Sequence, residues 1–341
     1  MSQVSPESSD LPAVIDVYDA ALFDLDGVVY LGSVVVPGAA EGIAALRERG
    51  ARVGFVTNNA ARSPGVVADH LVELGIPAES ADVVTSAQAA ARLVRDRFGA
   101  GARVLVVGGE GVRGALADAG LTGVDSADDG PVAVVQGFGL DLTWQQLNEA
   151  AVAIHRGAHW VATNTDPTRP TDRGIVPGNG AAVAAVQMAV SATPEVAGKP
   201  YRPLLDDTVA RLGAGRSIFV GDRLDTDIAG AIAAGLDSML VLSGSHGAPE
   251  LLAADPQSRP THLGRDLRAL LEPPRIVLEA GGAYRCGGAT ARLVDGRIEL
   301  EGAAPPLVDA LWAAAHLAWT ATDQGHPADH APALAALAQL S

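Results

Sequence analysis

The feature that most constrains the fold is a regular alternation of short apolar runs and helical patterns between residues 20 and 242. The apolar runs Ala20–Leu25, Arg52–Thr57 and Arg103–Val107 predict strands. Helical patterns such as Pro37–Arg49 and Pro64–Leu74 separate the strands, and a glycine follows each of these two. Such alternation is typical of an α/β protein, in which helices cover both faces of a doubly wound parallel sheet. The same pattern predicts strands at 82–86, 132–136, 160–162, 217–220 and 238–242, and helices at 87–98, 112–119, 144–156, 181–191, 204–212 and 228–234.

The two ends of the chain depart from this alternation. Residues 1–17 are polar and predict a flexible tail. Pro273 and Pro274 interrupt the pattern near the other end. Short strands are predicted beyond them at 276–278, 291–294 and 298–300, with an Asp-Gly turn at 295–296, followed by a helix at 307–321. Residues 275–341 are therefore expected to form a small β-plus-helix appendage of unknown role.

Composition excludes several classes of partner. Acidic residues outnumber basic ones by 40 to 24, so the formal net charge is −16. A nucleic-acid-binding protein and a protein held on an anionic membrane surface both need a basic face, so neither partner is expected. No apolar stretch reaches the roughly 18 residues that span a bilayer. The first ten residues lack the basic and apolar regions of a secretion signal, so we expect a cytoplasmic protein.

Lysine is almost absent from the chain. Of the 24 basic residues, only Lys199 is a lysine. Lysine is a compact point charge on a thin stem, whereas arginine is a wide planar fork. A single surviving lysine is therefore a candidate for a position at which arginine would not fit.

Polar side chains stand at the ends of several predicted strands. Asp24 and Asp26 follow one apolar run, Thr57 ends the next, and Asp222 follows another. Ligands of doubly wound sheets bind outside the carboxyl ends of the strands, so these side chains can meet in one crevice. Buried carboxylates need a partner, and an all-oxygen ligand set favours Mg²⁺.

The same residues suit the transfer of a phosphoryl group. Thr57, Asn58 and Lys199 can hold its three non-bridging oxygens. Asp24 can attack phosphorus to form an aspartyl-phosphate, and Asp26 can protonate the leaving alkoxide and later deprotonate water. Gly27 allows the chain to turn so that Asp26 faces back toward Asp24.

Four segments in this order resemble the four motifs of the haloacid dehalogenase superfamily of phosphohydrolases. They are Phe23-Asp-Leu-Asp-Gly27, Phe55-Val-Thr-Asn-Asn59, Gly198-Lys-Pro200 and Val220-Gly-Asp-Arg-Leu-Asp-Thr-Asp227. The last three resemble the type IIA branch, the nitrophenyl-phosphatase-like enzymes. The similarity extends over about residues 18–272 and implies a Rossmann-like catalytic core. Since Lys199 lies 142 positions after Thr57, we expect the core at 18–100 and 196–274 and an inserted α/β cap of type C2 at 101–195.

The resemblance also implies roles for individual residues. Asp24 would be the nucleophile and Asp26 the acid and base. Mg²⁺ would be held by the Asp24 carboxylate, the Asp26 backbone carbonyl and Asp222. Asp227 would orient a metal-bound water, with Asp225 as a weaker candidate for that role.

A large cap favours a small phosphorylated metabolite as the substrate. Among family members the chain is most similar to those that hydrolyse glycerol 3-phosphate, while phosphoglycolate and pyridoxal phosphate are the alternative substrates. Arg169 of the cap is expected to contact the substrate, with Asn164 and Asp166 positioning its loop; a plain turn carrying an exposed arginine is the alternative. Asn59 and Arg62 are further candidates from the core, and a homodimer is a compatible assembly.

Two other functions compete with a phosphatase. Gly109-Glu-Gly-Val-Arg-Gly114 fits the glycine pattern of a dinucleotide site, which would indicate an oxidoreductase. However, a complete strand–helix–strand unit precedes it, whereas the pattern normally follows the first strand, so the glycines are more simply interpreted as a tight turn. A binding protein that has lost catalysis is disfavoured, because Asp24, Asp26 and Lys199 are all present.

Overall fold

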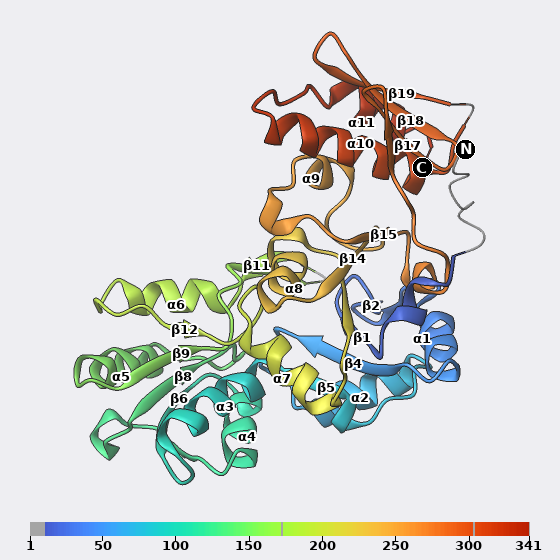
Figure 1. The fold of residues 1–341 in the computed structure, drawn as a ribbon. Coiled ribbons are helices and arrows are strands. Elements are labelled where there is room, and N and C mark those ends of the chain that lie inside the picture. The colour runs from blue at the N-terminus through green and yellow to red at the C-terminus, as the bar shows by residue number, and fades with distance from the viewer. Residues whose placement is uncertain (1–10, 172, 303, 341) are drawn as a thin grey trace. The chain divides into compact units, whose positions relative to one another are not determined.

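The computed structural model describes residues 11–171, 173–302 and 304–340 (Figure 1). The chain forms two compact units, of which the first contains Met1–Val53 and Ala214–Ser341 and the second contains Gly54–Gly213. The predicted core and cap boundaries near residues 100 and 195 stay a prediction. Residues 1–10 of the predicted tail lie outside the described residues, whereas its residues Val14–Val17 form a 3₁₀ helix.

The first unit contains strands that match the predicted parallel sheet. Strands β15, β14, β13 and β1 lie side by side in that order, and all of these pairs are parallel. The strands span Ala20–Asp24 (β1), Ser217–Gly221 (β13), Asp237–Val241 (β14) and His262–Gly264 (β15). Phe23 pairs with Val220, so β1 and β13 end at the same edge of the sheet. The predicted α/β fold class is confirmed.

Helices and turns connect these strands. They are the hairpin β2 (Tyr30–Leu31) and β3 (Val34–Val35), α1 (Ala39–Glu48), a π-helical turn η5 (Leu224–Ile228), α8 (Ala229–Ala234), α9 (Ala248–Leu252), and 3₁₀ turns at Pro256–Ser258 (η6) and Leu267–Leu271 (η7). Helix α1 buries Ala39, Ile43 and Leu46. Their spacing of three to four residues gives the helix one apolar face.

The C-terminal region is an antiparallel sheet with two helices. The sheet order follows the sequence: β16 (Leu278–Ala280), β17 (Ala283–Cys286), β18 (Ala289–Val294) and β19 (Arg297–Glu301). The predicted turn is present, because Asp295 and Gly296 both have positive φ, as a two-residue hairpin requires. Helix α10 (Leu307–Asp323) packs against β17 and β18, and α11 (Ala331–Leu337) follows it. Strand β17 and helix α11 were not predicted from the sequence, and the first predicted strand, 276–278, begins two residues before β16.

This C-terminal region shares its hydrophobic core with the parallel strands of the first unit. Trp312 and Trp319 of α10 belong to one buried cluster with Leu240 of β14 and Leu251 of α9. The Trp319 indole Nε1 donates a hydrogen bond to the Leu251 carbonyl at 2.9 Å. The single cysteine, Cys286, lies in the same cluster, where burial raises the pKa of its thiol to about 12. The appendage is therefore an integral part of the first unit.

The second unit contains a five-stranded parallel sheet in the order β12-β9-β8-β6-β7. Its core includes Leu105, Val134 and Trp160. Strand β4, which begins in the first unit, pairs in parallel with β5 here. The elements are β4 (Arg52–Thr57), α2 (Pro64–Glu73), η3 (Ser80–Asp82), β5 (Val83–Thr85), α3 (Ser86–Phe98), β6 (Arg103–Val107), α4 (Glu110–Asp118), β7 (Thr122–Val124), η4 (Ala127–Asp129), β8 (Ala133–Gln136), α5 (Trp144–His155), β9 (His159–Ala162), β10 (Thr168–Thr171), β11 (Gly174–Pro177), α6 (Asn179–Gln187), β12 (Glu195–Val196) and α7 (Pro203–Leu212).

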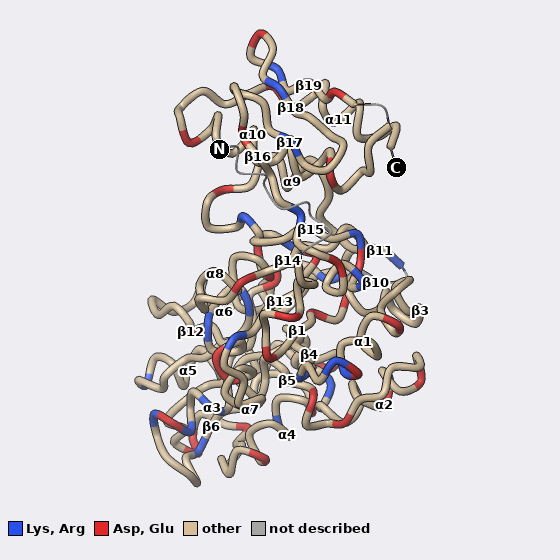
Figure 2. The backbone as a smooth tube through the Cα atoms, turned by 45° about the vertical axis from the view of Figure 1, so that its right-hand side comes forward, with Lys and Arg blue, Asp and Glu red and all other residues tan. Residues whose placement is uncertain are grey.

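Charged residues are dispersed over both units, as the coloured tube in Figure 2 shows. Within the described ranges, no helix is both long and apolar enough to cross a membrane.

Replacing Trp319 by alanine tests the shared core. We expect Trp319→Ala to lower the free energy of unfolding by about 3–5 kcal/mol, because it leaves a cavity in the cluster. Denaturant unfolding measures this change. Trp144, whose exposed fraction is 73%, provides the control, since Trp144→Ala should change stability little. Equal effects of the two substitutions would contradict a shared core.

His316 of α10 predicts an acid limit to stability. Its ring lies 4.6 Å from that of Trp312, and burial together with the nearby Arg259 charge lowers its pKa from the ordinary value of 6.5. The unfolded chain therefore binds a proton at His316 more readily than the folded chain does. The neutral His316 ring contributes its full stability above pH 6.5, and protonation removes that contribution as the pH falls below this value. Between about pH 7.5 and 5, the free energy of unfolding should fall less in His316→Gln than in the parent protein. An identical pH dependence in both would contradict this prediction.

Candidate active site

In the first unit, three carboxylates gather at the carboxyl ends of β1 and β13. Asp24 ends β1, Asp222 directly follows β13, and Asp227 lies in the π-helical turn. One carboxylate oxygen from each lies within 4.8 Å of the others. Asp222 and Asp227 are buried and Asp24 is half-buried. The parallel pairing predicted that Asp24 and Asp222 meet, and the structure confirms it.

Backbone N–H groups hold the two buried carboxylates. Asp227 Oδ2 accepts hydrogen bonds from the N–H groups of Asp222 and Arg223, each at 3.1 Å. Asp222 Oδ2 accepts one from the Ser245 N–H at 2.6 Å. Such bonds favour the charged form of a carboxylate. They also fix the direction in which each carboxylate points.

Two glycines leave the space that Asp222 occupies. A Cβ atom on Gly27 would lie 2.3 Å from Asp222 Oδ2, and one on Gly244 would lie 2.1 Å from the same atom. Gly27 also has φ +88°, which disfavours any other residue. Ser243 Oγ donates a hydrogen bond to the Gly27 carbonyl at 2.8 Å and so ties the turn after Asp26 to the segment after β14.

The donor set fits a hard divalent cation. Three carboxylates offer only oxygen ligands, which is the preference of Mg²⁺, and mutual repulsion among buried carboxylates favours a bound cation. Asp24, Asp222 and Asp227 would hold it. From the sequence we expected the Asp24 carboxylate, the Asp26 backbone carbonyl and Asp222 as ligands, with Asp227 orienting a metal-bound water, and that assignment stays a prediction. The side chain of Asp26 is exposed.

Asp225 is engaged elsewhere. Its carboxylate accepts hydrogen bonds from Arg223 Nε at 3.0 Å and Nη2 at 2.7 Å. Burial would raise the pKa of Asp225, but the Arg223 guanidinium outweighs it and holds the pKa below its usual range. The predicted supporting role of Asp225 stays a prediction.

In the second unit, Asn58 connects two of the predicted phosphate-binding segments. The Lys199 N–H donates to Asn58 Oδ1 at 2.8 Å, and Asn58 Nδ2 donates to the Lys199 carbonyl at 3.0 Å. Lys199 is buried, with an exposed fraction of 2%. Thr57, also buried, accepts a hydrogen bond from the Asn59 N–H through Oγ1 at 3.0 Å. The side chain of Asn58 thus fixes the backbone that carries Lys199.

The loop after β9 is joined to the same segment. Asn164 Nδ2 donates to the Asn58 carbonyl at 2.7 Å, and Asp166 Oδ2 accepts from Asn58 Nδ2 at 3.2 Å. Asn179 of α6 holds the Asn164 carbonyl at 2.7 Å. These contacts agree with a positioning role for Asn164 and Asp166.

The two arginines predicted to reach the substrate differ in their surroundings. Arg169 lies on β10 with its guanidinium 4.6 Å from the centroid of the Phe138 ring, a distance typical of a cation–π contact. Arg62 is exposed and precedes α2. Contact of either residue with a substrate stays a prediction.

The glycine pattern at Gly109–Gly114 has a packing explanation. A Cβ on Gly111 would lie 2.2 Å from the Ala60 carbonyl oxygen. Gly111 therefore allows α4 to approach the segment after Thr57 closely, which supports the interpretation of the glycines as structural.

The sequence analysis missed the segment Ser243–His246. Its signal was present: Gly244 lies between two serines immediately after an apolar strand. Sequence spacing alone does not show that this segment lies against Asp222.

Comparison with known proteins relates most of the chain to one family. The model of haloacid dehalogenase-like hydrolases matches residues 21–122, and a related HAD-hydrolase-like model matches residues 196–270. D-glycerol 3-phosphate phosphatase of Mycobacterium tuberculosis is 47% identical over 270 residues, which are 79% of this chain and 76% of that protein. A 5'-nucleotidase of Bacillus subtilis is 36% identical over 248 residues, or 72% of this chain and 94% of its own.

A solved structure extends this similarity to the C-terminal region. The crystal structure of glycerol phosphate phosphatase from M. tuberculosis in complex with magnesium has a TM-score of 0.84 and 40% identity. The match covers 97% of this chain and 99% of that one. The β-plus-helix region is therefore part of the shared fold.

Gly244→Ala tests the packing around Asp222. We expect the added Cβ to displace the Asp222 carboxylate, so that divalent-cation affinity falls on the order of tenfold or more. Titration calorimetry with Mg²⁺ measures this affinity. Gly288→Ala is the control, because a Cβ on Gly288 meets nothing within 4 Å. Unchanged Mg²⁺ affinity in Gly244→Ala would contradict the claim that the close approach of Gly244 positions the Asp222 carboxylate for the metal.

Proposed function

Because the chain belongs to the family of haloacid dehalogenase-like hydrolases, we propose that it is a Mg²⁺-dependent phosphatase that hydrolyses glycerol 3-phosphate to glycerol and phosphate. The observation that carries the proposal is the carboxylate triad of Asp24, Asp222 and Asp227 within a family member that is 47% identical to a glycerol 3-phosphate phosphatase. The match to a magnesium complex over nearly the whole chain supports the choice of metal.

In the first chemical step, an oxygen of Asp24 attacks phosphorus and the ester P–O bond breaks. Asp26 gives its proton to the leaving alkoxide, which departs as glycerol. The product on the enzyme is an aspartyl-phosphate on Asp24. In the second step Asp26 takes a proton from water, the resulting hydroxide attacks phosphorus, and the bond to Asp24 breaks to release phosphate.

The other residues stabilise charge. Bound Mg²⁺ supplies compensation for the negative charge of the carboxylates and the phosphoryl group. Thr57, Asn58, Asn59 and Lys199 are proposed to bind phosphoryl oxygens, a role for which Lys199 provides the positive charge. The side-chain hydrogen bonds of Asn58 to Lys199 support a positioning contribution from Asn58 as well.

Specificity is assigned to residues 101–195, the proposed cap. We propose that Arg169 contacts the substrate, that Asn164 and Asp166 hold its loop, and that Arg62 assists. Phosphoglycolate and pyridoxal phosphate are the alternative substrates from the sequence analysis. The similarity to a 5'-nucleotidase adds weight to testing a nucleoside monophosphate. We further propose that the enzyme works in the cytoplasm.

Phosphate release from a panel of esters tests this function. The panel contains glycerol 3-phosphate, phosphoglycolate, pyridoxal phosphate and a nucleoside monophosphate, each with Mg²⁺ and with chelator. We expect Mg²⁺-dependent release, fastest from glycerol 3-phosphate. A preference for another ester would reject this substrate, and no release from any ester would reject the function.

Asp24→Asn tests the covalent mechanism. The substitution removes the nucleophilic charge and keeps the shape, so turnover should fall on the order of a thousandfold or more while the thermal unfolding of the protein stays cooperative. Asp69→Asn is the matched control, because Asp69 is an exposed residue of α2 without a proposed role and should leave turnover unchanged. Near-normal turnover in Asp24→Asn would rule out the aspartyl-phosphate.

A further inference from the structure

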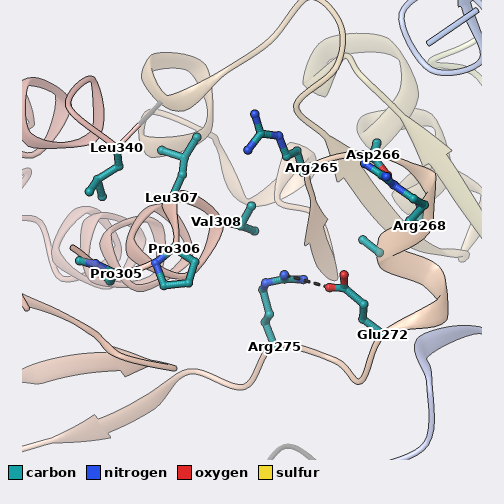
Figure 3. Close-up of a pocket in the computed structure, with 11 residues that line it drawn as sticks. Arg265, Asp266, Arg268, Glu272, Arg275, Pro305, Pro306, Leu307, Val308 and Leu340 are labelled. Carbon is teal, nitrogen blue, oxygen red and sulfur yellow. Dashed lines mark hydrogen bonds and ion pairs between the residues drawn. The ribbon is translucent and has the colours of Figure 1, made fainter. Parts of the chain in front are cut away.

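A cavity of about 510 Å³ lies in the first unit, and none of the residues that line it belongs to the carboxylate triad. It is lined on one side by residues after β15 and on the other by residues at the start of α10 (Figure 3). This volume is within the range of about 300–1,000 Å³ that is common for small-molecule sites.

Two of the three arginines of this cavity are committed to carboxylates. Arg268 makes a forked pair with Asp266, through Nε at 2.9 Å and Nη2 at 2.6 Å. Arg275 lies between Glu272 and Asp309, each at 3.0 Å. The positive charge of each of these two arginines is therefore largely offset by its carboxylate partners.

Arg265 is the exception. Its side chain is exposed, and its charge helps to lower the pKa of Asp266, but among the described residues it makes no hydrogen bond or ion pair. In Figure 3 it extends into the space between Leu307 and the Asp266–Arg268 pair. A guanidinium offers five N–H donors in a planar fork that matches carboxylate and phosphate oxygens. In a chain with a net charge of −16, the cavity thus holds a positive group with open donors.

The opposite wall is apolar. It consists of Pro305, Pro306, Leu307, Val308 and Leu340. A hydrated inorganic anion gains nothing from such a wall, whereas the carbon chain of an organic anion would bury apolar surface against it.

We propose that this cavity binds a small organic anion, whose carboxylate or phosphate-type head group contacts Arg265 and whose short carbon chain packs against Leu307 and Leu340. The ligand would connect the segment after β15 with α10 and so stabilise the junction between the parallel strands and the C-terminal region. This site is separate from the proposed phosphatase chemistry and does not depend on it.

Binding of matched six-carbon probes to the full chain tests the proposal. The probes are hexanoate, hexylphosphonate and the neutral 1-hexanol, measured by titration calorimetry without Mg²⁺ so that the carboxylate triad does not attract the anions through a metal. The variants are Arg265→Gln and, as control, Arg285→Gln, which removes an exposed arginine of β17 outside the cavity. Propanoate is added to measure the contribution of the carbon chain.

We expect at least one of the two anions to bind the parent protein and Arg285→Gln equally, and about tenfold more weakly to Arg265→Gln. The stronger of the two identifies the head group. Hexanoate should bind more tightly than propanoate, and hexanol should bind most weakly. Phosphatase turnover of Arg265→Gln should equal that of the parent.

Three results would overturn the proposal. They are the absence of binding by both anions at concentrations up to about 10 mM, equal affinities of the parent and Arg265→Gln, and binding of hexanol as tight as that of the anions.

Discussion

The repulsion among three carboxylates at one edge of the parallel strands is the constraint on which the rest of the first unit depends. One carboxylate oxygen from each of Asp24, Asp222 and Asp227 lies within 4.8 Å of the others, and two of the three residues are buried. Backbone N–H groups of Asp222, Arg223 and Ser245 offset part of the cost of that burial. The remaining negative charge favours the binding of a divalent cation. Gly27 and Gly244 lie so close to Asp222 that any side chain at either position would displace its carboxylate.

In the second unit, the main constraint is the burial of the single lysine, Lys199. The Asn58 side chain accepts a hydrogen bond from the Lys199 N–H and donates one to the Lys199 carbonyl. Its own carbonyl accepts hydrogen bonds from Asn164 and Ser86. A chain that otherwise uses arginine keeps lysine here, and Gly198, whose Cβ would lie 2.6 Å from Asn58 Oδ1, shows how little room the segment has.

Sequence patterns predicted the alternating strands and helices and the polar residues at the ends of the strands. The strands β1, β4 and β13 follow from their apolar runs, and the meeting of Asp24 with Asp222 follows from the parallel pairing of β1 with β13. The short hairpin β10–β11 was missed, because its four-residue strands carry no apolar alternation. The contacts of Ser243–His246 with Asp222 and the shared core around Trp319 were also missed, because they join residues far apart in the sequence and only the packing brings them together.

A Mg²⁺ titration that follows binding and turnover in the same samples tests the central claim most directly. Calorimetry on the metal-stripped protein and on Asp222→Asn would be combined with phosphate release from glycerol 3-phosphate. The account predicts that turnover rises with Mg²⁺ occupancy in the parent protein, and that Asp222→Asn loses affinity and turnover together. Full turnover of the metal-stripped protein, or unchanged Mg²⁺ binding by Asp222→Asn, would contradict it.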